Sequence, residues 1–98
     1  MNNHKAEQLI KEIIARFLNP REYKVFIFGS RVTGKASPFS DFDIGVMGKK
    51  PVSWKTLGLI EEALEDSDLP FTVDVVDFSQ TSQKFQKSAL SKTKTLTL

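Results

Sequence analysis

The stretch GSRVTGKASPFSDFD, residues 29–43, decides how this chain is organised. It begins where the apolar run 25–28 stops at Gly29 and Ser30, and it ends at two aspartates, Asp41 and Asp43, inside a second apolar run. A glycine turn brings backbone N–H groups close to a bound molecule, because no Cβ is in the way. Such groups, aided by a serine hydroxyl, suit phosphate oxygens. The stretch therefore predicts a phosphate-binding turn followed by an acidic strand.

The two aspartates are one residue apart, so on a strand their carboxylates point to the same face. Their Cα atoms would lie roughly 6–7 Å apart, and at an effective dielectric near 20 the two charges would repel by about 2–3 kcal/mol. Such a pair favours a cation, and hard oxygen ligands beside a phosphate site suit Mg²⁺. Taken alone, the pair also fits the solvated face of an ordinary hairpin, but the Gly-Ser turn before it favours a site.

Gly29-Ser30, a short loop and then SDFDIGV, residues 40–46, resemble the G-S…D-x-D motif of the nucleotidyltransferase superfamily related to DNA polymerase beta. The Gly-Ser-Arg-x-x-Gly form of the loop is most similar to the minimal nucleotidyltransferase branch. Members of that branch are stand-alone domains of about this length, often antitoxins encoded beside a HEPN-domain toxin. The resemblance covers roughly residues 5–90. It implies the polymerase beta-like palm fold, an α+β two-layer arrangement with a small mixed sheet and helices packed on one face.

The resemblance also implies roles for the acidic residues. Asp41 and Asp43 would hold two Mg²⁺ ions, and a third carboxylate would come from a neighbouring strand. Asp74 fits that place, because it faces away from the apolar stripe of its strand. Asp77 competes for it, but its position at the strand end before Ser79 favours helix capping.

The turn supplies the remaining candidate site residues. Gly29 and Ser30 would cradle the triphosphate of ATP, the expected substrate. Arg31 and Lys35 would place two cations beside it, with plain surface charges as the alternative.

The composition narrows the class of protein. The 98 residues, 40% of them apolar and with eight phenylalanines, predict one globular domain over residues 1–98. A net charge of +2 is too small to favour nucleic acid as a direct partner. There is no cysteine and one histidine, His4, which excludes thiolate and histidine-cluster metal sites within one chain. No apolar run is long enough to span a membrane, so a cytoplasmic location is expected.

The periodicity of apolar residues predicts six elements. They are a helix over 5–18, strands over 23–28, 39–47 and 71–77, and helices over 53–66 and 79–90. The first strand is apolar on both faces, which predicts a central position. Residues 29–40 are expected to be irregular. Ser53 is expected to be the N-cap of the helix over 53–66, and Trp54 is expected at the core or its edge. The tail, 91–98, would either fray or serve a partner.

The resemblance implies Mg²⁺-dependent transfer of AMP from ATP to a hydroxyl, expected to be a tyrosine, of a cognate HEPN toxin, which would silence that RNase. The HEPN pattern of an arginine followed several residues later by a histidine is absent, so the toxin would be a separate chain. The alternative is an antitoxin that neutralises its partner by stoichiometric binding without catalysis. An aminoglycoside-type transferase is a weaker third reading, because the chain has no room for an acceptor-binding domain.

Overall fold

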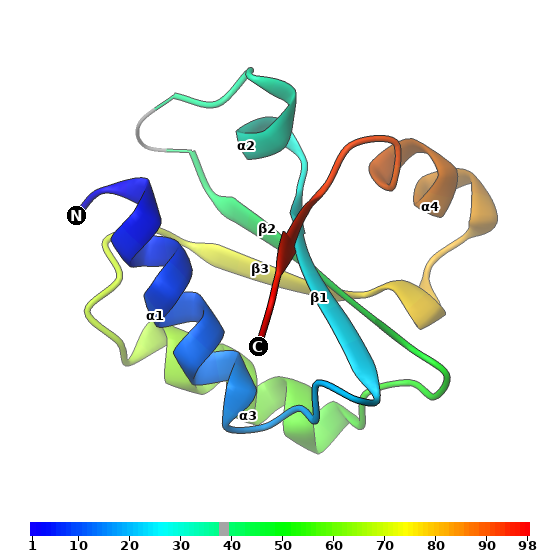
Figure 1. The fold of residues 1–98 in the computed structure, drawn as a ribbon. Coiled ribbons are helices and arrows are strands. Elements are labelled where there is room, and N and C mark those ends of the chain that lie inside the picture. Colours follow the sequence, from blue (N-terminus) through cyan, green and yellow to red (C-terminus); the bar gives the residue numbers. More distant parts are fainter. Residues whose placement is uncertain (38–39) are drawn as a thin grey trace.

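The computed structural model describes residues 1–37 and 40–98 and forms a four-stranded mixed sheet with helices on both sides of it (Figure 1). The strand order is β3-β2-β1-β4, with β1 antiparallel to β2 and β4, and β2 parallel to β3. In chain order the elements are α1 (Asn3–Ala15), β1 (Tyr23–Phe28), α2 (Ser30–Thr33), β2 (Phe42–Gly48), α3 (Trp54–Glu65), β3 (Val73–Asp77), the 3-10 turn η1 (Phe78–Gln80), α4 (Gln83–Ala89) and β4 (Lys94–Leu96).

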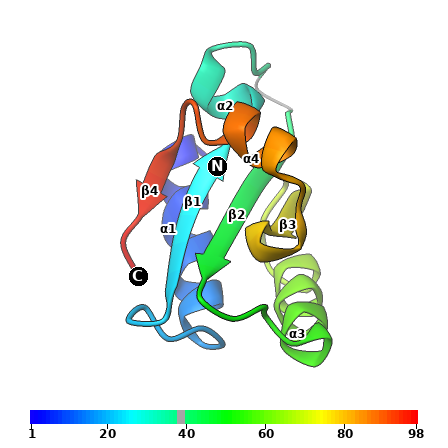
Figure 2. The ribbon, with the colours of Figure 1, turned by 90° about the vertical axis from the view of Figure 1, so that its right-hand side faces the viewer.

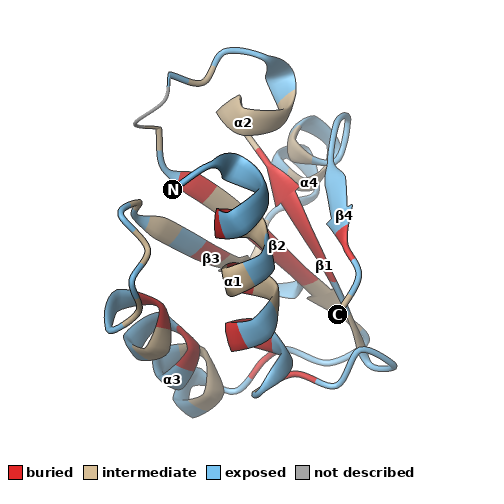
Figure 3. Cartoon of the chain, turned by 60° about the vertical axis from the view of Figure 1, so that its left-hand side comes forward, coloured by how far each residue is buried: buried red, intermediate tan, exposed pale blue. Residues whose placement is uncertain are grey.

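The two long helices, α1 and α3, cover one face of the sheet (Figure 3). The apolar stripe of α1, including Ile10 and Ile14, packs with Ile27 of β1, Ile44 of β2 and Ile60 of α3, and all five side chains are almost completely buried. Each such side chain contributes roughly 1.5–3 kcal/mol on leaving water. This layer confirms the predicted α+β fold with a small mixed sheet.

The opposite face of the sheet carries a smaller aromatic cluster. Phe26 and Phe28 of β1 meet Phe78 of η1 edge to face, with ring centroids 4.9 and 5.1 Å apart, and Phe85 of α4 joins at 5.6 Å from Phe78. Side chains alternate along a strand, so Ile27 points to the helix layer and its neighbours to this cluster. The prediction that the first strand is central and covered on both faces is confirmed.

The tail, residues 91–98, contains a strand that the sequence analysis did not predict. Lys94–Leu96 forms β4, an edge strand paired with β1 through Val25 and Leu96. Leu96 is buried, and the Lys94 Nζ lies 2.8 Å from Glu7 Oε1 on α1. The strand was missed because a Lys/Thr/Ser tract has little apolar pattern. Its pairing comes from a neighbour almost seventy residues earlier in the chain.

Trp54 is also not where the sequence indicated. Its side chain is 80% exposed at the first turn of α3, since the buried stripe of that helix runs through Ile60 and Leu64. The predicted N-cap is confirmed, because the Ser53 hydroxyl accepts the N–H of Thr56 at 3.2 Å.

Several helices begin or end at other residues than the sequence predicted, and N-cap residues set some of these boundaries. The first helix starts at Asn3 because the Asn2 side chain accepts the N–H of Lys5, and it ends at Ala15, before the predicted 18. His4 is exposed in its first turn, in agreement with a solvated residue. The stretch 29–40 contains the short helix α2 rather than only loop.

The second and third strands begin later than expected, at Phe42 and Val73, and the predicted start at Phe39 lies outside the described residues. The last helix divides into η1 and α4, because Ser82 caps a fresh start by accepting the N–H of Phe85. Within residues 1–37 and 40–98, no helix combines the length and apolar character needed to cross a membrane.

Candidate nucleotidyl-transfer site

The turn after β1 is shaped by Gly29 and the carboxylate of Asp43. Gly29 has φ +79°, a conformation that side chains with a Cβ rarely adopt, and it leads directly into α2 at Ser30. Phe28 and Asp43 are partners in the antiparallel β1–β2 register, which brings the turn against this carboxylate. A Cβ placed on Gly29 would lie 2.4 Å from Asp43 Oδ2. The turn and the acid can therefore touch only because residue 29 is glycine.

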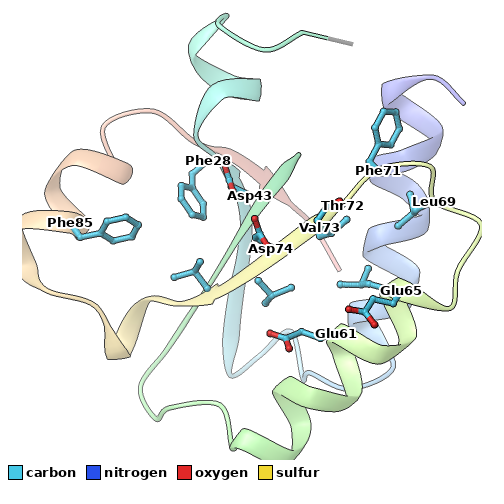
Figure 4. Close-up of a pocket in the computed structure, with 13 residues that line it drawn as sticks. Phe28, Asp43, Glu61, Glu65, Leu69, Phe71, Thr72, Val73, Asp74 and Phe85 are labelled. Atoms are coloured by element: carbon cyan, nitrogen blue, oxygen red, sulfur yellow. The ribbon is translucent and has the colours of Figure 1, made fainter. Parts of the chain in front are cut away.

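Asp43 and Asp74 lie side by side on neighbouring parallel strands, and they are partners in the β2–β3 register (Figure 4). Both point to the face opposite α1 and α3, since Phe42 and Ile44, which alternate with Asp43, belong to the helix-side core. Asp43 is half-buried and Asp74 is exposed. Burial, followed by the charges of Asp74 and Asp41, raises the pKa of the Asp43 carboxyl above its ordinary value.

Asp41 precedes β2 instead of lying within it, and its side chain is exposed. Its charge contributes to the raised pKa of Asp43, so it belongs to the same electrostatic environment. Yet over the described ranges no three side chains of the Asp, Glu, His and Cys types are arranged as a ready metal site. The structure thus pairs Asp43 with Asp74 and leaves Asp41 beside the pair.

An open cleft of about 800 Å³ begins at this acidic pair (Figure 4). The rings of Phe28 and Phe85 form one end of its lining, and the cleft continues along β3 to Glu61 and Glu65 of α3. These four lining residues were not among the sequence-based candidates. The one available signal was the i, i+4 spacing of the two glutamates, which places them on one side of a helix.

Arg31 was expected beside the phosphate site, and the structure engages it elsewhere. Its Nε donates to the Ser40 carbonyl at 3.0 Å, and its Nη2 donates to the same carbonyl. Its Nη1 donates to Asn3 Oδ1 at 3.1 Å. The guanidinium stacks 3.8 Å from the centroid of Phe42 and 4.7 Å from that of Phe71. Arg31 therefore fastens the end of the loop to α1 and β2 on the helix-covered side. An aromatic platform made by two distant segments cannot be read from the local sequence.

Lys35, the second expected cation, has an exposed side chain just after α2. Ser30 is half-buried at the first position of α2, beside Gly29. The first N–H groups of a helix have no acceptor within the helix. The turn therefore presents its N–H groups at the end of β1, as the sequence pattern suggested.

Asp77, the competitor of Asp74, has a structural position. It is buried, and its Oδ1 accepts the N–H and the hydroxyl of Ser79 at 3.0 and 2.7 Å. Its Oδ2 accepts the N–H of Val52 at 2.7 Å. The expected capping role of Asp77 is confirmed, and the added bond to Val52 ties the end of β3 to the start of α3.

Comparison with known sequences shows the family of this chain. Residues 7–97 match the family described as polymerase beta, nucleotidyltransferase. The chain belongs to this family. A curated relative from Haemophilus influenzae, named probable protein adenylyltransferase MntA, is 39% identical over 84 residues, which cover 85% of this chain and 73% of the relative.

Solved structures with the nucleotidyltransferase fold are also similar to this chain. A toxin–antitoxin complex with AMP-PNP has a TM-score of 0.74 at 23% identity, covering 92% of this chain and 71% of that one. A second is the complex of a tri-AMPylated Shewanella oneidensis HEPN toxin with its MNT antitoxin. Its TM-score is 0.62 at 24% identity, with the same coverage of 92% and 71%. At these identities the likeness establishes the shared fold.

Proposed function

We propose that this chain is a Mg²⁺-dependent nucleotidyltransferase antitoxin, which transfers AMP from ATP to a hydroxyl of a HEPN-type toxin. The observation that carries the proposal is the pair Asp43 and Asp74, which faces an open cleft directly beside the Gly29 turn. The named functions of the Haemophilus influenzae relative and of the Shewanella oneidensis complex support it. ATP is the proposed donor, so we place the reaction in the cytoplasm.

The residues of the site fit a divalent cation. Asp43 and Asp74 offer hard oxygen donors from adjacent strands. Burial and, after it, the like charges of Asp74 and Asp41 raise the pKa of Asp43, and a cation would relieve the repulsion between these charges. Mg²⁺ binds proteins through one or two carboxylates together with substrate phosphates, so a pair is sufficient to begin a site. We assign this pair, with Asp41 as the further acidic group, to the two expected ions. When bound, Mg²⁺ neutralises phosphate charge and lowers the pKa of a coordinated hydroxyl.

The chain's own groups would bind and orient the nucleotide. Backbone N–H groups of the Gly29–Ser30 turn and the Ser30 hydroxyl would hold the triphosphate, and Lys35 remains a candidate for a charge contact with it. Arg31 would act through the loop that it fastens rather than through the phosphates.

The acceptor oxygen attacks the α-phosphorus of ATP, the bond from that phosphorus to the bridging oxygen of pyrophosphate breaks, and pyrophosphate leaves. The exposed Asp74 is positioned to accept the proton of the hydroxyl. Docking of a protein partner would supply the orientation that an acceptor domain supplies in larger enzymes. We propose a tyrosine as the acceptor, as the family resemblance implies.

Intact-mass spectrometry of the candidate toxin tests the proposal. Incubation with the chain, ATP and Mg²⁺ should add whole AMP units to the toxin, and Asp43→Asn should abolish the addition while the variant keeps its fold by circular dichroism. Asp68→Asn, an exposed aspartate between α3 and β3, is the matched control and should leave transfer intact. A toxin that stays unmodified, yet is neutralised equally well by Asp43→Asn, would establish a binding-only antitoxin instead.

A further inference from the structure

The cleft at the acidic pair extends well beyond the space that two carboxylates need. It passes around the outer edge of β3 and reaches Glu61 and Glu65 on α3 (Figure 4). Leu69 and Phe71, in the segment before β3, supply half-buried apolar surface along the same cleft. The site is therefore one end of a groove whose other end is on the helix-covered side of the sheet.

The groove has one sign of charge. Asp43, Asp74, Glu61 and Glu65 line it, and none of its described lining residues is a lysine or an arginine. The chain as a whole has a net charge of +2, so this negative surface is local. Clefts lined by one sign of charge concentrate oppositely charged ligands. A nucleic acid would be repelled along the groove, whereas a cationic protein segment would be attracted.

The backbone of β3 also faces the groove. No described strand lies beyond β3 in the sheet, which makes it an edge strand (Figure 2). The N–H of Phe42 donates to the Thr72 carbonyl at 2.9 Å, so the backbone groups of residue 72 point to β2. Because these groups alternate in direction along a strand, those of Val73 and Val75 point outward, toward the groove. Edges of this kind accept an added strand from another chain.

We propose that the groove holds an extended, lysine- or arginine-rich segment of the protein partner, paired with β3, which brings the acceptor hydroxyl to Asp43 and Asp74. This inference rests on the proposed function, since the hydroxyl is the acceptor of that reaction. Side chains of an added strand alternate between the two faces of the sheet. Its basic residues therefore lie on the α3 side, near Glu61 and Glu65, and the acceptor lies on the other side.

The spacing agrees with this alternation. Residues four apart on a helix have Cβ atoms about 5–6 Å from each other, and residues two apart on a strand are roughly 6–7 Å apart. Two basic residues that flank the acceptor therefore match the separation of Glu61 and Glu65. The segment has the pattern basic, acceptor, basic.

Fluorescence anisotropy with short peptides tests the groove without nucleotide. The first probe is a fluorescein-labelled nine-residue peptide with a central tyrosine between two lysines, and the second carries glutamates in place of these lysines. The lysine peptide should bind at least about tenfold more tightly, and added salt should weaken it. The double variant Glu61→Gln with Glu65→Gln should weaken it about fivefold, because each exposed ion pair contributes little.

The matched control is the double variant Glu12→Gln with Glu62→Gln. It makes the same change in net charge at exposed glutamates that do not line the groove, and it should bind the lysine peptide as the unchanged protein does. N-methylation of every second backbone amide of the peptide should remove binding when it blocks the N–H groups that face β3. It should leave binding unchanged when it blocks the N–H groups that face away from β3. This measurement leaves the protein unaltered, so it is independent of any folding defect in a variant.

Three results would overturn the inference: equal affinity for the two peptides, an equal loss in both double variants, or indifference to N-methylation. A dimer in sedimentation that the lysine peptide cannot dissociate would also overturn it, since a second copy of the chain would then occupy the edge. The proposed function is tested separately. If Glu61→Gln with Glu65→Gln left AMP transfer to the toxin unaffected, the proposed function would stand and the proposed binding of a basic segment in the groove would be rejected. Specific peptide binding without any AMP transfer would do the reverse.

Discussion

At the scale of single residues, the site depends on a contact between a glycine without a side chain and a carboxylate. Gly29 has a positive φ, and a Cβ added to it would collide with Asp43 Oδ2. A side chain at this position would therefore cost free energy in two ways, through backbone strain and through steric contact. Gly34 has the same φ of +79° but open space around it. The two glycines therefore allow backbone strain and steric contact to be measured apart.

We expect Gly34→Ala to destabilise the protein by about 1 kcal/mol, the cost of a left-handed conformation. Gly29→Ala should cost at least about 1 kcal/mol more, because the added methyl must also displace Asp43. Urea denaturation measures both free energies of unfolding. Equal losses for the two variants would mean that the contact with Asp43 is relieved without cost.

The charge of Asp43 is unfavourable in the folded protein, because burial and the neighbouring carboxylates of Asp74 and Asp41 disfavour it, and this raises the pKa of the carboxyl. A raised acid pKa means that the folded state is penalised above that pKa, and the penalty disappears as the pH falls below the ordinary value of 3.8. We therefore expect Asp43→Asn to stabilise the nucleotide-free protein at pH 7, by up to about 1 kcal/mol after solvent screening of this partly exposed site.

Thermal unfolding from pH 7 to pH 3 checks this expectation. The difference between Asp43→Asn and the unchanged protein should be largest at neutral pH and should shrink toward pH 3. A variant that is less stable at pH 7 would show that the carboxylate supports the fold instead.

At the scale of elements, two aspartates of one strand lie in different surroundings, and we assign chemistry to one and structure to the other. Asp77 is buried and accepts three hydrogen bonds, which connect β3 to η1 and to the segment before α3. Asp74, three residues earlier, is exposed and faces the cleft. The difference arises because β3 ends at Asp77, which is the N-cap of η1, whereas Asp74 lies within the strand.

Asp77→Ala should destabilise the protein by about 2–3 kcal/mol, since it leaves buried backbone donors without their acceptor. Asp74→Ala should leave stability within about 0.5 kcal/mol, as is usual for exposed positions, and should abolish AMP transfer. Urea denaturation and the mass assay separate the two effects. The opposite pattern would reverse the roles assigned to the two residues.

The edge strand β4 gives a second test at this scale. Leu96 is buried against the helix-side core, whereas Leu98 is only partly buried beyond the last pairing. Leu96→Ala should cost about 2–3 kcal/mol, at the lower end for buried leucines because an edge can relax. Leu98→Ala should cost clearly less. Similar small losses in denaturation would indicate that β4 contributes little to the stability of the sheet.

At the scale of the whole molecule, ligand binding should appear as added stability, because a ligand that binds only the folded state raises its free energy of unfolding. We expect ATP with Mg²⁺ to raise the melting temperature, by a few degrees at concentrations well above the dissociation constant. ATP with EDTA should do much less, since the carboxylates then repel the phosphates. Equal shifts in the two conditions would argue against a metal-bridged nucleotide.

The sequence by itself determined the sheet-and-helix fold, the central first strand and the Gly29–Ser30 turn, because all three depend on local patterns. The sequence pattern paired Asp43 with Asp41 on one strand, whereas the structure pairs Asp43 with Asp74 across the β2–β3 register. Apolar periodicity sets the faces of helices and strands, and a glycine beside a serine marks the turn whatever lies around it. The different surroundings of Asp74 and Asp77 were also predictable, since alternation along one strand distinguishes them.

Only the tertiary structure decided which distant segments meet. The platform of Phe42 and Phe71 that holds Arg31, the pairing of β4 with β1 and the groove from Asp74 to Glu61 each join residues far apart in the chain. Such contacts depend on long-range packing, and a polar tail or a lone arginine carries no local sign of them. The exposed Trp54 follows the same rule, because the rotation of α3 on the sheet is set by Ile60 and Leu64.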